Sequence, residues 1–324
     1  SAEQINGVWH LTLHSLRDDT SRVVTARMIV NAGGPWVEDI IQNKIRLNSS
    51  EGVRLVRGSH LITKKLYDHE KCYFFQGEDG RIIFTIPYET DFTLIGTTDV
   101  EHADISIKPE CTIEEQNYLI NFASQYFKVK VTIDDIIKTY SGVRPLYNDN
   151  ASSASAATRD YVLSIDESLG APILNVFGGK ITTYRKLSEN ALDKISKILP
   201  LVDVGWTAGV PLPGGDFDIE ELQDLNDKLL KKYTFLDQFW ATRLLKAYGL
   251  DAFSILGCSN KVEDLGISFG ATLTEKEVVW LIEKEYAQTA DDIIWRRSKL
   301  GLRLSNQEIE TLSVWVNENL TIIK

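Results

Sequence analysis

The sequence lacks both of the common glycine-rich nucleotide motifs. None of its 324 residues forms a G-x-G-x-x-G or a G-x-x-x-x-G-K-[ST] pattern. Such patterns place backbone N–H groups around the phosphates of a bound nucleotide. The usual turn that holds the phosphates is therefore absent from this chain. If the chain contributes to a nucleotide site, it does not supply the part that binds the phosphates.

Cysteine is scarce and shows no pairing pattern. The three cysteines are odd in number, far apart and without a C-x-x-C motif, at Cys72, Cys111 and Cys258. This usage suits a reducing cytosol and gives no support for a zinc site or an iron–sulfur cluster. The histidines outside the motifs discussed below show no metal-ligand spacing either; they are His10, His14, His69 and His102. We therefore expect no metal.

Long apolar runs and long basic stripes are missing as well. No stretch approaches the roughly 20 apolar residues that a membrane-spanning helix needs, so contact with a membrane is expected to be peripheral. The net charge of −11 argues against a nucleic-acid partner, because phosphate backbones repel such a surface. With 43% hydrophobic and 25% charged residues, the composition is that of a folded protein and excludes disorder.

The first residues are unusual for a complete protein. The chain has no initiator Met and no signal region, and the segment GVWHLTL at 7–13 alternates like the middle of a sheet. We therefore expect the chain to be a fragment whose natural N-terminal part has been removed.

The sequence changes character near residue 200. Short strand patterns alternate with helices before that point, and the pattern from about 217 onward is almost purely helical. Between them lies WTAGVPLPGGDFD at 206–218, whose two prolines and three glycines cannot continue a helix or a central strand. The polar segment 148–160 reads as a flexible loop.

Three segments of the first part predict specific elements. Residues 27–43 read as a strand, a glycine turn and the start of a helix, which is typical of a layered α/β domain. Residues 71–99 predict a three-stranded antiparallel meander with Gly/Asp turns. Residues 111–127 predict a helix, because Thr112 and Glu115 have the spacing of a capping box.

The segment NVFGGKITTYRKL at 175–187 carries the clearest chemical signal. An apolar strand ends at Gly178-Gly179, Lys180 follows, and apolar residues three or four apart predict a helix of about five turns from Ile181 to Ile198. A helix N-terminus carries partial positive charge and unpaired N–H groups, and the lysine adds a full charge, so this end would stabilise negative charge. The alternative is a plain connection with a surface lysine, and the loop by itself leaves both open.

Seven motifs together resemble the flavin-dependent, membrane-associated glycerol-3-phosphate dehydrogenases. They occur in the family's order from about residue 7 into the C-terminal helices. They are VNAGGPWV, RLVRGSHLIT, FTLIGTTDVEH, TYSGVRPL, ATRDYVLSI, FGGKITTYRKL and ADDIIWRRSKLGL.

The resemblance implies an α/β plus α+β fold. It consists of the C-terminal part of a glutathione-reductase-type FAD domain, an antiparallel-sheet substrate domain and an all-helical C-terminal domain. The implied boundaries are 1–45 for the remaining FAD-binding domain, 46–140 for the substrate sheet, 141–205 for the return to the FAD domain, 206–217 for the linker and 218–324 for the helical cap.

The resemblance also implies a cofactor site. Ala32, Gly33 and Gly34 resemble the second glycine turn that approaches the dinucleotide. In the glycine loop that follows residue 177, the backbone N–H groups would face the pyrimidine edge of the flavin ring, where charge accumulates on reduction. The residues of this loop in the cofactor site are Gly178, Gly179, Ile181 and Thr182. The family's first βαβ unit, with its own glycine turn, is missing. FAD is therefore expected for the full-length protein and not for this fragment.

Four charged or titratable residues match the family's substrate site. Arg144 and Arg159 match its phosphate-binding arginines, whose planar donors suit a phosphomonoester; the alternative for each is a surface ion pair. His60, read as lying at the end of a strand, matches the active-site histidine and would remove the hydroxyl proton; the alternative is a packed, neutral histidine. Lys180 would orient the substrate hydroxyl or stabilise the reduced flavin.

The implied reaction is oxidation of glycerol 3-phosphate to dihydroxyacetone phosphate, with electrons passing to membrane quinone. The protein would be cytoplasmic and peripheral on the inner face of the membrane. An oxygen-using oxidase of the same family and a non-catalytic folded fragment remain alternatives, and a homodimer stays open.

The basic segments 228–232 and 295–303 are either lipid contacts or solvated helix faces. The C-terminal tryptophans are expected in the helical core or a subunit interface; they are Trp240, Trp280, Trp295 and Trp315.

Overall fold

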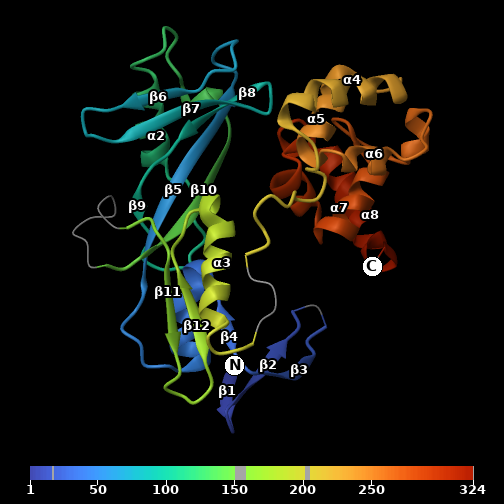
Figure 1. The fold of residues 1–324 in the computed structure, drawn as a ribbon. Coiled ribbons are helices and arrows are strands. Elements are labelled where there is room, and N and C mark those ends of the chain that lie inside the picture. Colours follow the sequence, from blue (N-terminus) through green and yellow to red (C-terminus); the bar gives the residue numbers. More distant parts are fainter. Residues whose placement is uncertain (17, 150–157, 201–204, 324) are drawn as a thin grey trace. The chain divides into compact units, whose positions relative to one another are not determined.

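The chain divides into two compact units, Ser1–Ala208 and Gly209–Lys324 (Figure 1). The computed structural model describes residues 1–16, 18–149, 158–200 and 205–323. The division falls inside the linker predicted at 206–217. Most of the flexible loop predicted at 148–160 lies outside the described residues.

A large antiparallel sheet organises the first unit. Its strand order is β10-β5-β8-β7-β6, and β9 also pairs with β5. The strands are β5 (Val53–Lys64), β6 (Tyr73–Gln76), β7 (Ile82–Tyr88), β8 (Phe92–Gly96), β9 (Val100–Glu101) and β10 (Ile136–Tyr147). Strands β6 to β8 confirm the predicted meander. The two longest strands, β5 and β10, lie side by side through eleven paired positions, and β10 runs through the boundary predicted at residue 140.

Helix α2 (Ile113–Ala123) covers one face of this sheet. The predicted capping box is present, because the Thr112 side chain accepts from the N–H of Glu115 and the Glu115 carboxylate accepts from the N–H of Thr112. Apolar side chains of the helix meet those of the strands in a core of Leu61, Ile83, Ile95, Leu119, Ile120, Phe122, Ala123 and Val131. A short 3-10 turn, η3 (Ile133–Asp135), leads into β10.

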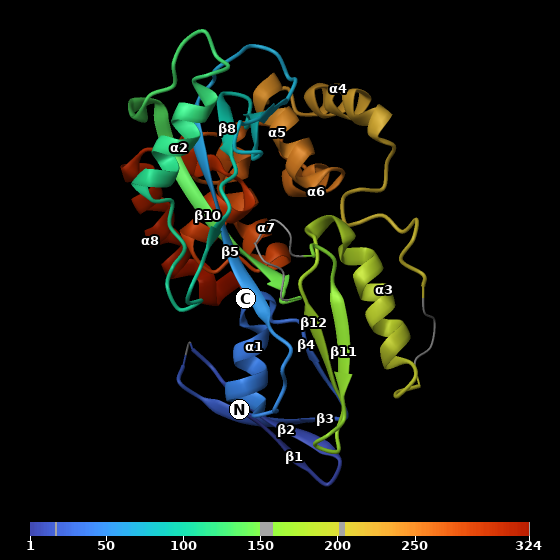
Figure 2. The same ribbon diagram turned by 90° about the vertical axis from the view of Figure 1, so that its left-hand side faces the viewer.

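A smaller sheet carries the two glycine turns. Strand β12 (Ile173–Phe177) lies between β11 (Val162–Asp166), to which it is antiparallel, and β4 (Ile29–Asn31), to which it is parallel. All five residues of β12 are buried. Figure 2 shows helices α1 (Val37–Asp39) and α3 (Tyr184–Ile195) flanking this sheet. The sheet between helices confirms the predicted α/β layering.

Helix α3 is shorter than predicted. A 3-10 turn, η4 (Ile181–Thr183), precedes it, and the α-helix ends at Ile195 instead of Ile198. Residues 196–199 form turns, with the N–H of Leu199 donating to the carbonyl of Ile195 at 2.8 Å. Pro200 accounts for the early end, because a proline disfavours helical geometry in the residue before it.

Several short elements complete the first unit. The glycine turn after β4 continues as the 3-10 turn η1 (Gly34–Trp36), then α1, then the π-helical segment η2 (Ile40–Ile45). The N-terminal residues form a separate antiparallel sheet of β1 (Ala2–Ile5), β2 (Val8–His14) and β3 (Ser21–Ala26). Trp9 in β2 is fully buried, and its indole N–H donates to the carbonyl of Pro172 at 2.8 Å. This bond fixes the N-terminal sheet next to the start of β12.

The second unit is helical, as predicted, apart from one small hairpin. Its helices are α4 (Leu222–Lys232), α5 (Gln238–Tyr248), α6 (Asp251–Leu256), α7 (Glu275–Glu285) and α8 (Asn306–Ile323). Shorter turns are η5 (Ile219–Glu221), η6 (Val262–Leu265), η7 (Asp292–Arg297) and η8 (Leu300–Leu302). The hairpin, β13 (Ser268–Gly270) and β14 (Leu273–Thr274), was not expected. The four tryptophans, expected in the helical core or a subunit interface, pack against the buried cluster of this unit.

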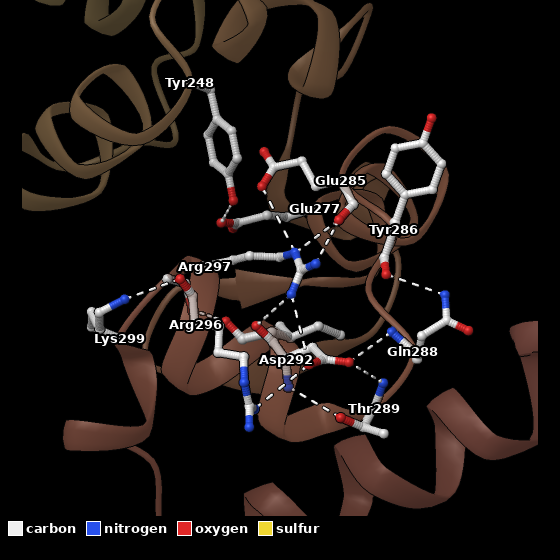
Figure 3. A network of polar contacts seen from close by, with 12 residues as sticks. Tyr248, Glu277, Glu285, Tyr286, Gln288, Thr289, Asp292, Arg296, Arg297 and Lys299 are labelled. Carbon is white, nitrogen blue, oxygen red and sulfur yellow. Dashed lines mark hydrogen bonds and ion pairs between the residues drawn. The ribbon is translucent and has the colours of Figure 1, made fainter. Parts of the chain in front are cut away.

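The predicted basic segment 295–303 includes one arginine with a structural role. Figure 3 shows the Arg297 guanidinium at the C-terminal end of α7. Its Nε and Nη2 donate to the carbonyl of Glu285 at 3.0 and 2.6 Å, and Nη1 donates to the carbonyl of Asp292 at 3.2 Å. A cation near the last carbonyls of a helix satisfies acceptors that the helix leaves open. This residue therefore joins α7 to η7, whereas neighbouring Arg296 is mostly exposed.

Candidate active site

The candidate site residues His60 and Arg144 lie on the same face of the large sheet. Successive side chains of a strand point to opposite faces. Ser59 in β5 points toward α2, where it bonds to Glu115, so its neighbour His60 points the other way. Arg144 in β10 is paired with Val56, four residues before His60 on β5. The sequence placed these two residues in separate motifs, and the strand register brings them to one surface.

His60 is held between two neighbouring strands. It is paired with Tyr140 of β10 on one side and Gly96 of β8 on the other. The imidazole stacks on the Tyr140 ring, with centroids 4.8 Å apart and the planes at 6°. A Cβ at Gly96 would overlap the imidazole ring. His60 therefore lies in the middle of β5, not at the end of a strand as expected from the sequence.

The imidazole of His60 is neutral at physiological pH. Burial, followed by the positive charge of Arg144, lowers its pKa from 6.5 to about 4. Its Nδ1 is buried and has no hydrogen-bond partner among the described residues. A neutral imidazole has one ring nitrogen with a free lone pair, and that nitrogen can accept a proton from a hydroxyl. The packed, neutral histidine foreseen as the alternative is thus compatible with a role as a base.

Arg144 is fixed by contacts to the segment after β8. Its Nη1 donates to Asp99 Oδ1 at 2.7 Å and its Nη2 donates to Thr97 Oγ1 at 3.2 Å. The guanidinium lies over Gly58, where a Cβ would approach its atoms to 2.5–2.7 Å. About a third of the side chain is exposed. A guanidinium has five donors, so others remain for an anion.

Arg159 lies in the segment between β10 and β11, close to the glycine loop. The carbonyls of Asp160 and Pro145 come within 3.1 and 3.5 Å of the position that a Cβ of Gly178 would take. The end of β10, the residues before β11 and the loop after β12 therefore meet at one place. The Arg159 side chain is exposed and makes no hydrogen bond or ion pair with the residues that the structure describes.

The loop after β12 has the geometry of an open helix start. Gly178 and Gly179 have φ values of +67° and +100°, which side chains rarely adopt. Lys180 is exposed and extended, and its carbonyl accepts bonds from the N–H and the hydroxyl of Thr183, both at 3.0 Å. No side chain caps η4 or α3. The N–H groups of Ile181 and Thr182, at the first turn, therefore face outward from the helix end.

Two buried asparagines connect this loop to the other glycine turn. Asn31 at the end of β4 donates from Nδ2 to the carbonyl of Val37 at 3.0 Å and to Asn175 Oδ1 at 3.1 Å. Its Oδ1 accepts from the N–H of Gly33 at 3.3 Å. Above Gly34, whose φ is +55°, no atom lies within 4 Å of the Cβ position. The turn at 31–34 is thus shaped by Asn31 and open on its outer side.

Sequence reasoning did not single out several residues that build the site. Asn31, Asn175, Thr97, Asp99, Tyr140, Gly58 and Gly96 are in this group. The available signals were polar residues inside buried strand patterns and glycines inside strands, which mark close approach of other groups. Among the described residues, no group of histidine, cysteine or carboxylate side chains could hold a metal ion. No helix in the described part of the chain is long and apolar enough to cross a membrane.

Comparisons with known proteins identify the family. The FAD dependent oxidoreductase family matches residues 1–185, and the C-terminal domain of alpha-glycerophosphate oxidase matches residues 206–317. A glycerol-3-phosphate dehydrogenase of Pseudomonas aeruginosa is 44% identical over 94% of this chain and 59% of its own length. The aerobic glycerol-3-phosphate dehydrogenase of Escherichia coli is 39% identical over 98% of this chain and 64% of its own length.

Two further proteins are similar to this chain. The D-erythritol 1-phosphate dehydrogenase of Brucella abortus is 39% identical over 99% of this chain and 64% of its own length. A solved glycerol-3-phosphate dehydrogenase from Bacillus halodurans, complexed with FAD, has a TM-score of 0.77 and 23% identity, and the match covers all of this chain and 68% of that one. The chain spans about three-fifths of the length of the curated relatives that it matches. With more than half of its residues matched by the family, the chain belongs to the FAD dependent oxidoreductases.

Proposed function

We propose that this chain takes part in the oxidation of glycerol 3-phosphate to dihydroxyacetone phosphate. The observation that carries the proposal is the common face of β5 and β10, where a neutral His60 and the guanidinium of Arg144 lie next to each other. The guanidinium covers Gly58, which is one same-face position away from His60. Same-face positions on a strand are about 7 Å apart, so a three-carbon phosphate ester can reach both groups.

Each residue has a distinct task in this reaction. The guanidiniums of Arg144 and Arg159 bind the phosphate, since planar forked donors match its oxygens better than an ammonium does. His60 accepts the proton of the secondary hydroxyl at a ring nitrogen while hydride leaves the same carbon. Lys180 and the uncapped start of η4 supply positive charge that stabilises the negative charge developing during the reaction. When bound, FAD supplies the hydride acceptor.

The two glycine turns fit a flavin. The loop at 178–182 offers uncapped N–H groups and a lysine, which suit the electron-rich edge of a reduced ring. The turn at 32–34 is open on the outer side of Gly34 and is braced from behind by Asn31, so the backbone can approach a bound group closely. We assign Ala32, Gly33 and Gly34 to one contact, and the loop residues Gly178, Gly179, Ile181 and Thr182 to the other.

The remaining parts of the proposal concern the partners. We infer that electrons leave to membrane quinone, with oxygen as the alternative acceptor, and that the protein is cytoplasmic with peripheral contact to the inner face of the membrane. The names of the relatives from P. aeruginosa and E. coli support the substrate. The relative from B. abortus gives the competing substrate, a four-carbon phosphate ester.

Anaerobic flavin reduction tests the proposal directly. Protein that joins this chain to a G-x-G-x-x-G-containing FAD-binding segment, and is loaded with FAD, is mixed in a stopped-flow instrument with glycerol 3-phosphate or erythritol 1-phosphate, and bleaching of the flavin is recorded without any acceptor. We expect fast bleaching by glycerol 3-phosphate and an at least hundred-fold slower reaction for His60→Gln, because loss of one positioned base typically costs about 10² to 10⁴ in rate. Faster bleaching by the four-carbon ester would reassign the substrate, and wild-type rates in the variant would remove His60 as the base.

A further inference from the structure

A buried carboxylate on helix α2 lies directly behind the candidate site. Glu115 is 6% exposed, and its two oxygens accept four hydrogen bonds. Oε1 accepts from Thr98 Oγ1 at 2.6 Å and from Ser59 Oγ at 2.8 Å. Oε2 accepts from Arg57 Nη2 at 2.9 Å and from the N–H of Thr112 at 3.0 Å. Burial raises the pKa of this carboxyl, but the bonds and the charge of Arg57 outweigh it and the pKa is lowered overall.

The contacts of Glu115 exceed those of a helix cap. A capping box needs only the backbone N–H and the side chain of Thr112. The bonds to Ser59 and Thr98 instead reach across to two different parts of the sheet domain. Ser59 also bonds to Ser141 of β10, with 2.8 Å between the hydroxyl oxygens. The carboxylate therefore ties helix α2 to β5, to β10 through Ser59, and to the segment after β8.

The residues held by Glu115 alternate with those of the candidate site. Thr98 lies between Thr97 and Asp99, which are the two residues that accept hydrogen bonds from Arg144. Thr98 is 1% exposed, and its hydroxyl oxygen also accepts from the N–H of Ser59 at 3.0 Å. Holding Thr98 from behind thus fixes the positions of both acceptors in front.

We propose that Glu115 is a positioning residue for phosphate recognition, acting through Thr98 on the orientation of the Arg144 guanidinium. The inference rests on the proposed function for its phosphate ligand. When Asp99 and Thr97 are fixed, their hydrogen bonds to Nη1 and Nη2 fix the orientation of the Arg144 guanidinium. Without the bond from Thr98 to the carboxylate, the segment 97–99 shifts and the guanidinium loses its preset direction.

Two substitutions separate this role from a general contribution to folding. Thr98→Val keeps the shape of the side chain and removes its bonds to Glu115 and Ser59. Thr112→Ala is the matched control, because it removes the hydroxyl that caps the same helix and leaves the hydrogen bonds of Thr98 to Glu115 and Ser59 in place. Both changes are expected to lower the melting temperature, so thermal unfolding compares their structural effects on one scale.

The functional readout is binding of phosphate. In FAD-loaded protein that joins this chain to the glycine-rich FAD-binding segment, we measure KM and kcat for glycerol 3-phosphate and the inhibition constant of inorganic phosphate. Thr98→Val is expected to raise KM and the inhibition constant ten-fold or more and to change kcat much less. Thr112→Ala is expected to leave both within two-fold of wild type. Equal effects of the two variants on KM and on the inhibition constant would overturn the proposal.

A second measurement needs neither turnover nor phosphate. The charge of Arg144 contributes to the low pKa of His60, so a displaced guanidinium lets the pKa of the imidazole rise. An NMR titration of His60 is expected to show this rise in Thr98→Val and in Glu115→Gln, and no rise in Thr112→Ala. If glycerol 3-phosphate and phosphate fail to bind to wild-type protein, the proposed function is wrong, and this titration still decides whether Glu115 positions Arg144. An unchanged His60 pKa in both site variants would refute that role.

Discussion

His60 and Gly96 face each other across strands β5 and β8, and the imidazole ring occupies the space that a Cβ at position 96 would fill. Arg144 of β10 is paired with Val56 of β5, and its guanidinium reaches diagonally over the next same-face position, Gly58. The side chains of both candidate site residues therefore lie against glycines of a neighbouring strand. Glycine is needed at both positions because the imidazole and the guanidinium occupy the space that a side chain would fill.

Gly96→Ala is expected to displace the imidazole from its stack on Tyr140. Overpacking of this kind costs about 1–3 kcal/mol of stability, and a misplaced base should slow flavin reduction by about a hundred-fold or more. Stopped-flow bleaching and thermal unfolding measure the two effects. Gly142→Ala is the matched control on the same face, since no atom lies within 4 Å of the Cβ position at Gly142. Equal rates of flavin reduction in the two variants would mean that the space left by Gly96 does not position the imidazole.

The low pKa of His60 predicts a specific pH dependence of stability. Its folded pKa is about 4 and its ordinary value is 6.5, so the unfolded chain binds more protons between these pH values. The free energy of unfolding should therefore fall as the pH drops from 6.5 toward 4, and this contribution should vanish above 6.5. Urea unfolding at pH 5 and 7.5 checks this point. His60→Gln, which removes the titrating group, should show a smaller drop; an identical drop would mean that the imidazole titrates normally.

Arg144→Lys and Arg159→Lys are expected to weaken phosphate binding far more than folding. The charge remains in each variant, but the forked geometry is lost. Arg144→Lys also loses one of the two bonds to Asp99 and Thr97, so it should have the larger effect on kcat/KM for glycerol 3-phosphate. Steady-state kinetics and a melting curve on each protein provide the test. Unchanged kcat/KM in both would exclude the two arginines as the phosphate site.

The 324-residue chain, expressed by itself, is expected to hold FAD weakly or not at all. The reason is the absence of a G-x-G-x-x-G turn from its sequence, since this turn supplies the contacts to the pyrophosphate. The absorption spectrum of the purified chain and a titration with FAD measure this property. A yellow preparation with one FAD per chain would contradict the expectation and would mean that the turns at 31–34 and 178–182 suffice.

Local features of the fold were predictable, and non-local ones were not. The capping box of Thr112 and Glu115, the meander and the loop after β12 follow from spacing within one segment. The early end of α3 was missed because periodicity continued past the point where Pro200 stops the helix.

The candidate site was predicted by residue and not by geometry. The motifs named His60, Arg144 and the glycine loop, but the register that pairs Arg144 with Val56 depends on strands 88 positions apart, which no local pattern encodes. The partners Thr97 and Asp99 were missed for the same reason. The hydrogen bonds that Glu115 accepts from Ser59 and Thr98 were also missed, because its capping role already explained its position in the sequence.

The hydrogen bond between Asn31 and Asn175 has a consequence for the order of folding. It joins side chains 144 residues apart and links the strands that precede the two glycine turns. Contacts this distant in the chain form late, because a long loop must close before they can stabilise anything. In the proposed cofactor site, the two turns can face one cofactor only after β4 has docked beside β12. A chain that ends before residue 175 therefore cannot form this part of the site.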